Sequence, residues 1–320
     1  MNSGTDVPSV RSWNPPFFME TNGRDVRATT FVVRDYDLAA TLTSGQAFRW
    51  IFLNDAWEGV IAGRWVRLRA GAFSISAETA APMNDWHWLR DYLQLDLDLA
   101  AVVRTFPDDE PMRAAVKACP GLRLLRQDPW ECLASFILSS TKQIVQIRQI
   151  VALLCERFGE PCSVEPVARL GAAHPDSATG RTLQFSFPTP QRLAAASEAE
   201  LRACKMGFRA PNLLNAARQI AEGKLDLERL RQLSCAEARE ELMKLRGVGG
   251  KIADCVLLFA YGFDAAFPVD VWIERALQEL YFPRRRARAK RLRRFAATHF
   301  GPHAGYAQQY LFHYMRTKMK

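Results

Sequence analysis

The chain has 320 residues, 48% hydrophobic and 24% charged, a composition typical of a folded protein of two or three domains. Its 43 Lys and Arg against 34 Asp and Glu give a net charge of +9 at pH 7, which fits a nucleic-acid partner and equally a soluble enzyme with a basic surface. No apolar run approaches the ~18 residues of a membrane span, and neither a secretory signal nor a nucleotide-binding fingerprint occurs.

Residues 1–28 are rich in Pro, Ser and Asn, which predicts a poorly ordered arm. Short β-branched and aromatic runs separated by turn residues occupy about 29–76 and predict an antiparallel sheet with one solvated face. From about residue 85 the apolar period becomes helical. Helices are expected over 85–106, 109–118, 129–158 (broken at the polar residues 139–142), 190–203, 209–222, 226–232, 235–245, 249–262, 270–281, 287–299 and 302–317.

The seven cysteines are odd in number and fall mostly inside apolar helical patterns, which indicates reduced, buried thiols. No CxxC occurs and the last cysteine is Cys255, so no iron–sulfur or zinc cluster is expected beyond it. The five histidines show no metal-ligand spacing. We therefore expect no metal ligands and no required cofactor.

A glycine hairpin is the most informative feature of the sequence. Gly247, Val248 and Gly249 separate a helix that ends near Leu245 from another that begins at about Gly249 and Gly250. Two glycines around one apolar residue indicate a sharp turn with close backbone approach, and the free N–H groups of the second helix suit a phosphate oxygen. The pattern favours a helix-hairpin-helix clamp for the DNA backbone, although the same turn also occurs between ordinary helices.

Lys251 and Asp270 are the candidate catalytic pair. A lysine in the first turn of a helix is electrostatically disfavoured, and this promotes the neutral amine that a nucleophile needs. The alternative is a surface lysine that contacts DNA phosphate. Asp270 opens the next predicted helix, where an aspartate most often only caps the helix. Its apolar neighbours also suit a partly desolvated acid/base or electrostatic partner.

The hairpin, Lys251 and the PVDV around Asp270 resemble the helix-hairpin-helix/Gly-Pro-Asp superfamily of DNA base-excision glycosylases, and within it the 8-oxoguanine DNA glycosylases. The resemblance covers about residues 31–316. It also rests on Ser44–Trp50, Leu124–Pro129, Gly207–Ala210 and Gly301–Gln308.

The resemblance implies that the damaged nucleotide is flipped out of the duplex. Lys251 would attack C1′ of its sugar, expel the base and form a Schiff base, after which β-elimination can nick the strand. Asp270 would stabilise the developing oxocarbenium charge and assist proton transfers.

Four residues would read the flipped base. The backbone carbonyl of Gly45 would accept the N7 hydrogen that distinguishes 8-oxoguanine from guanine. Cys255 and Phe312 would sandwich the base, and Gln308 would read its Watson–Crick edge. Each has an ordinary alternative: a plain turn for Gly45, core packing for Cys255 and Phe312, and a surface position for Gln308.

Phe208 would fill the gap left by the flipped base, unless it is a core aromatic, and Arg209 would contact the opposite strand's base. The chain departs from the family's eukaryotic members at Thr141 and Gln146, where they have Asn and Arg on the orphaned cytosine. Strict selection for cytosine is therefore not expected.

Trp272 and Met315 replace a His–Asp pair of those members. Two apolar residues at paired positions predict a rebuilt, packed contact, and they leave open which group holds the adjacent phosphate. The basic run 284–294 carries eight Lys and Arg, which fits DNA contact or a solvated helix face equally.

The expected fold is α+β and mainly helical, with a small antiparallel β-domain packed on a two-lobed helical region. We expect an arm at 1–28, a β-domain with flanking helices at 29–118, and a helical glycosylase domain at 119–320, with the hairpin unit at 236–262 and the active site between the lobes. The partner would be double-stranded DNA with an oxidised purine, bound by a monomer without membrane association.

A structural cation at the hairpin is compatible with this reading. The location would be the cytoplasm, at the nucleoid in a bacterium, or the nucleus in a eukaryote. The alternatives are a glycosylase of the same superfamily for an alkylated or ring-saturated base, and a non-catalytic helix-hairpin-helix DNA-binding protein.

Overall fold

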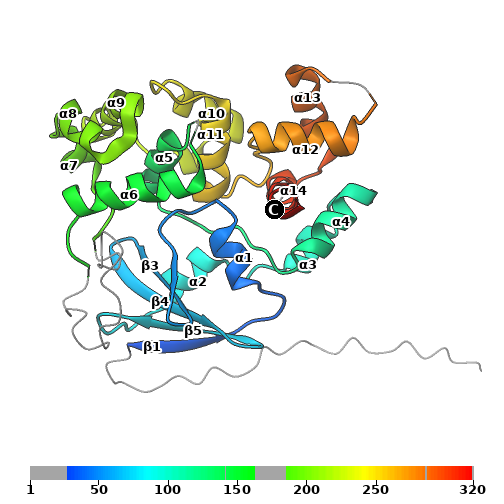
Figure 1. Ribbon diagram of the computed structural model, residues 1–320, viewed down its shortest axis with the longest axis horizontal. Coiled ribbons are helices and arrows are strands. Elements are labelled where there is room, and N and C mark those ends of the chain that lie inside the picture. Colours follow the sequence, from blue (N-terminus) through cyan, green and yellow to red (C-terminus); the bar gives the residue numbers. More distant parts are fainter. Residues whose placement is uncertain (1–26, 141, 163–184, 285–286, 319–320) are drawn as a thin grey trace, which may run out of the picture.

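The computed structural model describes residues 27–140, 142–162, 185–284 and 287–318. A small sheet forms one end of the molecule and a larger body of helices the other (Figure 1). This is the α+β, mainly helical architecture that the sequence predicts. Among the described residues, no helix is both long enough and apolar enough to cross a membrane.

The sheet is antiparallel with strand order β1-β5-β4-β3-β2. Its strands are β1 (Ala28–Val32), β2 (Ile51–Leu53), β3 (Ala56–Ile61), β4 (Arg64–Ala70) and β5 (Ser74–Thr79). Alternate residues of β4 and β5 are buried, among them Val66, Leu68 and Ile75, as expected for a sheet with one solvated face. The buried face packs against helices α1 (Leu38–Thr43) and α2 (His87–Leu93).

Several of the elements expected from the sequence are wrong. The single helix expected over 85–106 is two helices, α2 and α3 (Leu99–Val103), because Gln94 adopts a left-handed conformation and Asp98 caps a new start. Helix α1 lies where only strands were expected, with Asp37 as its N-cap. Residues 226–232 form only a short 3₁₀ turn, η4 (Arg229–Gln232).

The helical body contains the long segment 129–158, and the break predicted in it is confirmed. Helix α5 (Pro129–Leu138) begins where Asp128 accepts a hydrogen bond from the Glu131 N–H, and α6 (Ile144–Phe158) follows the break. The other helices are α4 (Glu110–Ala118), α7 (Pro190–Ala194), α8 (Glu198–Leu201), α9 (Ala210–Ala221), α10 (Cys235–Met243), α11 (Gly250–Val256), α12 (Val271–Tyr281), α13 (Ala289–His299) and α14 (Ala304–Lys318), with the π-helical turns η2 (Arg202–Met206) and η5 (Leu257–Tyr261) and the 3₁₀ turn η3 (Gly207–Arg209).

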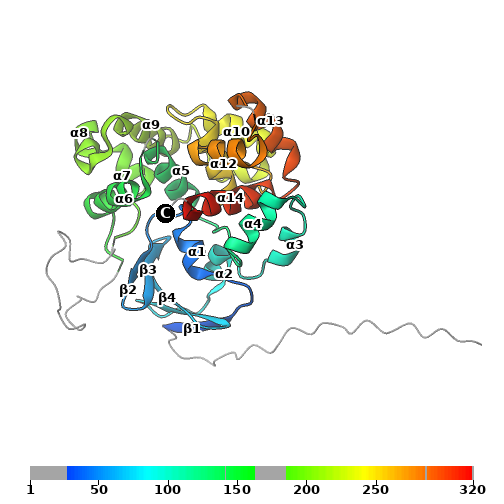
Figure 2. The same cartoon turned by 45° about the vertical axis from the view of Figure 1, so that its right-hand side comes forward.

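Helix α14 lies between the sheet part and the helices of the hairpin unit (Figure 2). The buried amide of Gln309 on α14 donates to the Ser44 carbonyl at 3.1 Å. Because Ser44 precedes Gly45, this bond fixes α14 against the backbone next to Gly45.

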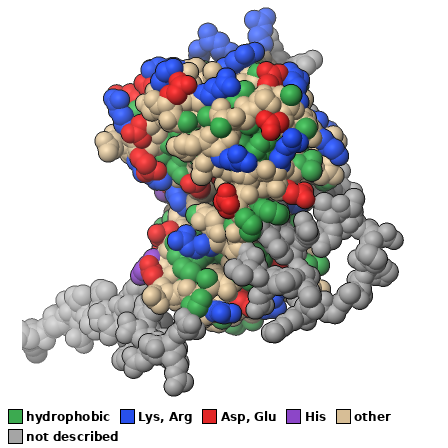
Figure 3. Space-filling view, turned by 90° about the vertical axis from the view of Figure 1, so that its left-hand side faces the viewer, with side chains coloured by type: hydrophobic (Ala, Val, Ile, Leu, Met, Phe, Trp, Pro, Cys, Tyr) green, Lys and Arg blue, Asp and Glu red, His purple; other side chains and the backbone are tan. Residues whose placement is uncertain are grey.

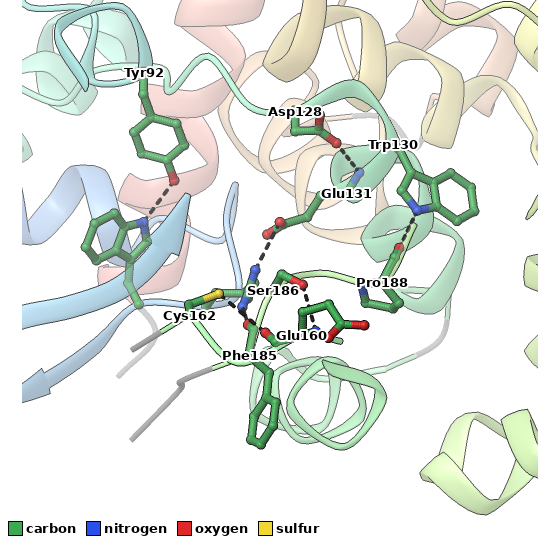
Figure 4. A network of polar contacts seen from close by, with 11 residues as sticks. Tyr92, Asp128, Trp130, Glu131, Glu160, Cys162, Phe185, Ser186 and Pro188 are labelled. Atoms are coloured by element: carbon green, nitrogen blue, oxygen red, sulfur yellow. Dashed lines mark hydrogen bonds and ion pairs between the residues drawn. The ribbon is translucent and has the colours of Figure 1, made fainter. Parts of the chain in front are cut away.

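A buried ion pair also joins the two parts. Arg49, next to the sheet, donates to Glu131 on α5 at 3.1 Å, and also to the Phe185 carbonyl. Figure 4 shows Glu131 beside Asp128 and the Phe185 segment. Removing one partner of a buried pair typically costs ~3–5 kcal/mol, because the other charge is then left unpaired. The pair therefore holds the β-part and the helical body in one arrangement.

Candidate active site

The hairpin between α10 and α11 places the first catalytic candidate. Gly247 has a φ of +81°, and the Asn212 side chain occupies the space that a Cβ would need. Val248 is buried between the two helices, as predicted. Gly249 is the N-cap of α11, and a Cβ built on it would meet no atom within 4 Å. The backbone at this end of α11 is therefore open to a ligand.

Lys251 lies in the first turn of α11 and is half-buried. Its Nζ donates a hydrogen bond to Ser139 Oγ at 3.2 Å and lies 5.2 Å from the centre of the Phe136 ring. Ser139 is the C-cap of α5, so the amine is held where the long helical segment breaks. This geometry orients the amine and leaves it reachable.

Asp270 is the N-cap of α12, and its carboxylate accepts a hydrogen bond from the Ile273 N–H at 2.9 Å. Burial raises the pKa of this carboxyl above its usual range. The N–H groups of the helix start and the Lys251 charge act in the opposite direction. Asp270 is therefore both a cap and a partly desolvated carboxylate close to the amine.

Cys255 follows Lys251 by one helical turn on α11 and is buried. Burial raises the pKa of its thiol to about 12, with Lys251 lowering it and Asp270 raising it. Both predicted catalytic groups thus interact electrostatically with one sulfur. The thiol is neutral at physiological pH, which suits a soft contact surface and not a nucleophile.

Gly45 and Phe312 are brought together from opposite ends of the chain. Gly45 has a φ of +86°, and a Cβ built on it would lie 3.3 Å from Phe312 Cε1. The same Cβ would lie 2.9 Å from Ile144 Cδ1 and 3.3 Å from Arg316 Nη1. Only glycine allows this backbone to approach α6 and α14 so closely.

Gln308 precedes Phe312 by one turn on α14 and is only 4% exposed. The alternative of a surface glutamine is therefore wrong. Its Oε1 is buried and has no hydrogen-bond partner among the described residues. An unpaired buried carbonyl is costly, and a ligand that donates a hydrogen bond would satisfy it.

Phe208, in the 3₁₀ turn η3, is 60% exposed, so the alternative of a core aromatic is wrong. The Arg209 guanidinium lies 4.3 Å from the centre of its ring. Arg209 itself is buried, and it donates to the carbonyls of Met206 and Ser140. Its guanidinium thus bonds to the α5–α6 connection.

The residues at which the chain departs from the eukaryotic pattern have different surroundings. Thr141 lies outside the described residues. Gln146 is exposed and closes a capping box at the start of α6, where its Oε1 accepts from the Gln143 N–H at 3.2 Å. Trp272 is half-buried on α12, and Met315 is buried on α14, which packs against α12.

The described Lys and Arg of the basic run are exposed along and before α13, while Arg285 and Arg286 lie outside the described residues. Figure 3 shows another face, on which Lys and Arg side chains of the helical body are mixed with acidic ones. That face therefore carries no single basic patch.

Three residues near the site were not predicted individually from the sequence: Ser139, Arg148 and Arg316. Ser139 was counted only as part of a helix break. Arg316 follows the predicted site residue Phe312 by four positions on α14, and this helical spacing could have found it. Arg148 follows no predicted site residue at such a spacing.

In the described ranges, no group of three His, Cys, Asp or Glu side chains could hold a metal ion. The cation suggested at the hairpin would use backbone carbonyls and a phosphate, so it stays a prediction.

Family models match most of the chain. The N-terminal domain of 8-oxoguanine DNA glycosylase matches residues 30–133, and the HhH-GPD superfamily of base excision DNA repair proteins matches residues 134–301.

Individual relatives cover nearly the same length. A probable N-glycosylase/DNA lyase of Methanothermobacter thermautotrophicus is 31% identical over 89% of this chain and 95% of its own. The N-glycosylase/DNA lyase of Saccharomyces cerevisiae is 32% identical over 76% of this chain and 68% of its own. The 8-oxoguanine glycosylase/lyase of Clostridium acetobutylicum, solved with double-stranded DNA containing cytosine opposite 8-oxoG, superposes with a TM-score of 0.79 at 28% identity, covering 91% of this chain and 99% of that one. The chain belongs to the 8-oxoguanine DNA glycosylase family of the HhH-GPD base-excision repair superfamily.

Proposed function

We propose that this protein removes 8-oxoguanine from duplex DNA and cleaves the resulting abasic site, as a DNA glycosylase and lyase that acts through a lysine Schiff base. The observation that carries the proposal is the half-buried Lys251 amine in the first turn of α11, which is held 3.2 Å from Ser139 Oγ and whose charge interacts with the Asp270 carboxylate at the start of α12. Amine and carboxylate come from separate helix starts, and the charge of each affects the pKa of the buried Cys255 thiol.

In the proposed reaction, the neutral Lys251 amine attacks C1′ of the flipped nucleotide. The N-glycosidic bond breaks, and the base leaves with its electron pair and takes up a proton. Asp270 stabilises the positive charge on the sugar, and the Ser139 hydroxyl orients the attacking amine. The sugar ring then opens to the Schiff base, and loss of the C2′ proton expels the 3′ phosphate.

Base recognition is assigned to Gly45, Cys255, Gln308 and Phe312. The closeness of Gly45 to Phe312 and the unpartnered Oε1 of buried Gln308 support this assignment. An amide oxygen accepts hydrogen bonds, and the Watson–Crick edge of a guanine offers N–H donors. The binding energy would thus include the relief of an unpaired buried acceptor.

Backbone contact is assigned to the hairpin, with Gly247, Gly249 and Gly250 presenting N–H groups and Val248 holding the turn. Phe208 would enter the gap left by the flipped base, as its exposure allows. We further propose that a monomer with a helical glycosylase domain at 119–320 acts where the cell's DNA is, without a cofactor.

Opposite-base selection is proposed to be relaxed. Gln146 is engaged in the cap of α6, and Arg209 is tied to the Ser140 carbonyl. To select cytosine, Arg209 would have to leave these partners.

Borohydride trapping tests the proposal on duplexes that carry one 8-oxoguanine opposite each of the four bases. A covalent adduct that is lost in Lys251→Gln, while that variant still binds a duplex with a tetrahydrofuran abasic analogue, is the expected result. Exposed Lys244→Gln, seven residues earlier, is the matched control and should trap normally. Trapping by Lys251→Gln would refute the nucleophile, and trapping only with alkylated or ring-saturated bases would refute the substrate.

A further inference from the structure

Arg316 lies beside the base-recognition residues Gly45 and Phe312, and the charge of Arg148 acts on it. The reaction proposed above uses neither arginine. Arg148 follows Ile144 by one turn of α6, and Arg316 follows Phe312 by one turn of α14. Ile144, Phe312 and Arg316 all approach the position of a Cβ on Gly45 to within 3.3 Å. The Arg316 guanidinium therefore lies beside Gly45, and Arg148 lies on α6 one turn beyond Ile144, which also borders Gly45.

Neither arginine has a hydrogen-bond or ion-pair partner within the part of the chain that the structure describes. The Nε of Arg148 is buried and unsatisfied. The Arg316 guanidinium lies 5.3 Å from the centre of the Phe312 ring, which is a weak contact by comparison with a carboxylate. Two partly buried guanidiniums thus stand without a counterion.

The electrostatics agree with this geometry. Burial lowers the pKa of both groups, and the Arg148 charge lowers the pKa of Arg316 further, so the two cations repel each other. Asp270 acts on Arg316 in the opposite direction but forms no ion pair with it, since its carboxylate faces the Ile273 N–H. Such an arrangement costs stability unless an anion binds between the two groups.

We propose that Arg148 and Arg316 together bind the phosphodiester next to the flipped nucleotide, on the Gly45 side of the base. The inference rests on the proposed function, because it takes the ligand to be a flipped nucleotide. A phosphodiester offers a full negative charge and two non-bridging oxygens, which suits two guanidinium forks. The edge of a neutral purine offers less charge and fewer acceptors to two cations.

The test is a binding cycle between protein and DNA. Affinity is measured for a duplex with a tetrahydrofuran abasic analogue, in which each phosphate around the analogue is replaced in turn by an uncharged methylphosphonate. For the wild-type protein, one neutralised phosphate should weaken binding about tenfold or more, as loss of a charge-assisted hydrogen bond would. In Arg148→Gln and Arg316→Gln, binding should already be weaker, and the same methylphosphonate should cause little additional loss.

Salt dependence supplies a second readout, since each lost phosphate contact should reduce the slope of log affinity against log salt by about 0.9. The matched control is Arg69→Gln, an exposed arginine on β4, which should retain the wild-type response to every methylphosphonate. Arg148→Lys and Arg316→Lys keep the charge, so their binding should again depend in part on the charge of that phosphate. This separates loss of contact from misfolding.

The inference is wrong if, at every phosphate, the loss of affinity from the arginine substitution and the loss from the methylphosphonate simply add. It is also wrong if losses appear only with 8-oxoguanine duplexes and not with the abasic analogue, because they would place the pair on the base. Excision of 8-oxoguanine by the wild-type protein is measured separately. If the wild-type protein excises 8-oxoguanine but the effects of the arginine variants and the methylphosphonates are independent, only the phosphate assignment is wrong. If those effects depend on each other but no 8-oxoguanine is excised, only the proposed substrate is wrong.

Discussion

Lys251 Nζ lies 3.2 Å from Ser139 Oγ, so the candidate nucleophile is held by the residue that ends helix α5. The Ser139 hydroxyl in turn donates to the Phe136 carbonyl at 2.8 Å. A hydroxyl can do both because it has one donor and two acceptor lone pairs. The break in the long helical segment thus positions the Lys251 amine through Ser139.

Replacing Ser139 by Ala is expected to slow excision by five- to tenfold, since a typical hydrogen bond contributes ~1 kcal/mol. Binding to an abasic-analogue duplex should be unchanged, because Ser139 acts by positioning the amine. Ser139→Thr keeps the hydroxyl and should restore the rate. The control is Ser140→Ala, whose hydroxyl donates to the Ile137 carbonyl at 3.4 Å. Single-turnover rates measure these effects, and equal slowing in Ser139→Ala and Ser140→Ala would contradict the positioning role.

Asp270→Asn is expected to reduce excision by ~100-fold or more, the usual range for loss of an acid/base group. Asn is as good an N-cap as Asp, so the hydrogen bond to the Ile273 N–H should persist and α12 should stay intact. Single-turnover excision and thermal unfolding measured on the same variant separate the two roles. A large loss of melting temperature together with activity would indicate that Asp270 is only a cap.

The raised pKa of Asp270 also predicts a pH dependence of stability. Because burial raises the pKa in the folded state, the protonated form favours folding. That contribution is complete below the ordinary aspartate pKa of ~3.9 and is lost as the pH rises through the raised value. Asp270→Asn mimics the protonated form, so its stability relative to wild type should increase over this window and then remain constant. Denaturant unfolding at several pH values measures the difference, and a decrease over the same window would contradict the prediction.

Gly45→Ala is expected to abolish 8-oxoguanine excision. Its φ of +86° and the contacts with Ile144, Phe312 and Arg316 leave no room for a Cβ. Gly63→Ala is the matched control, because Gly63 has a φ of +77° but no atom within 4 Å of the added Cβ. Both variants should lose ~1–2 kcal/mol of stability from backbone strain, and only Gly45→Ala should lose activity as well. Denaturant unfolding and excision rates check this, and an active Gly45→Ala would rule out the proposed close approach.

Phe208→Ala is expected to leave stability nearly unchanged, because the side chain is 60% exposed, and to weaken binding of lesion-containing duplex. The wedge role requires this, since nothing else would fill the gap in the base stack. Phe73→Ala removes another exposed phenylalanine, in the sheet part, and should bind DNA normally. Equilibrium binding to duplexes with and without the abasic analogue is the measurement. Equal affinities of the two variants would refute the wedge.

Much of the fold could be predicted because strong local signals mark it. The Asp128–Pro129 start and the glycines of the hairpin are where the sequence places them. Helix α1 is too short for its period to be seen among strands, and the break at Gln94 uses a non-glycine residue in a left-handed conformation. Neither feature has a clear local signature.

Individual residues of the candidate site could be predicted only where they belong to a recognisable sequence motif. The burial of Arg209 and its bond to the Ser140 carbonyl depend on packing between segments 69 residues apart. The nearness of Arg316 to Gly45 likewise joins the two ends of the chain. Such long-range contacts have no periodic trace in a single sequence.

The amide of Gln46 is fully buried, and its Nε2 donates to the carbonyls of Thr41 and Arg123 while its Oε1 accepts from the Leu125 N–H. The backbone next to Gly45 is therefore held in place by hydrogen bonds within the protein. If this carbonyl reads the damaged base, no ordering entropy is lost there on binding. The speed of inspecting each guanine would then be limited by extrusion of the base from the helix, and not by rearrangement of the protein segment that examines it.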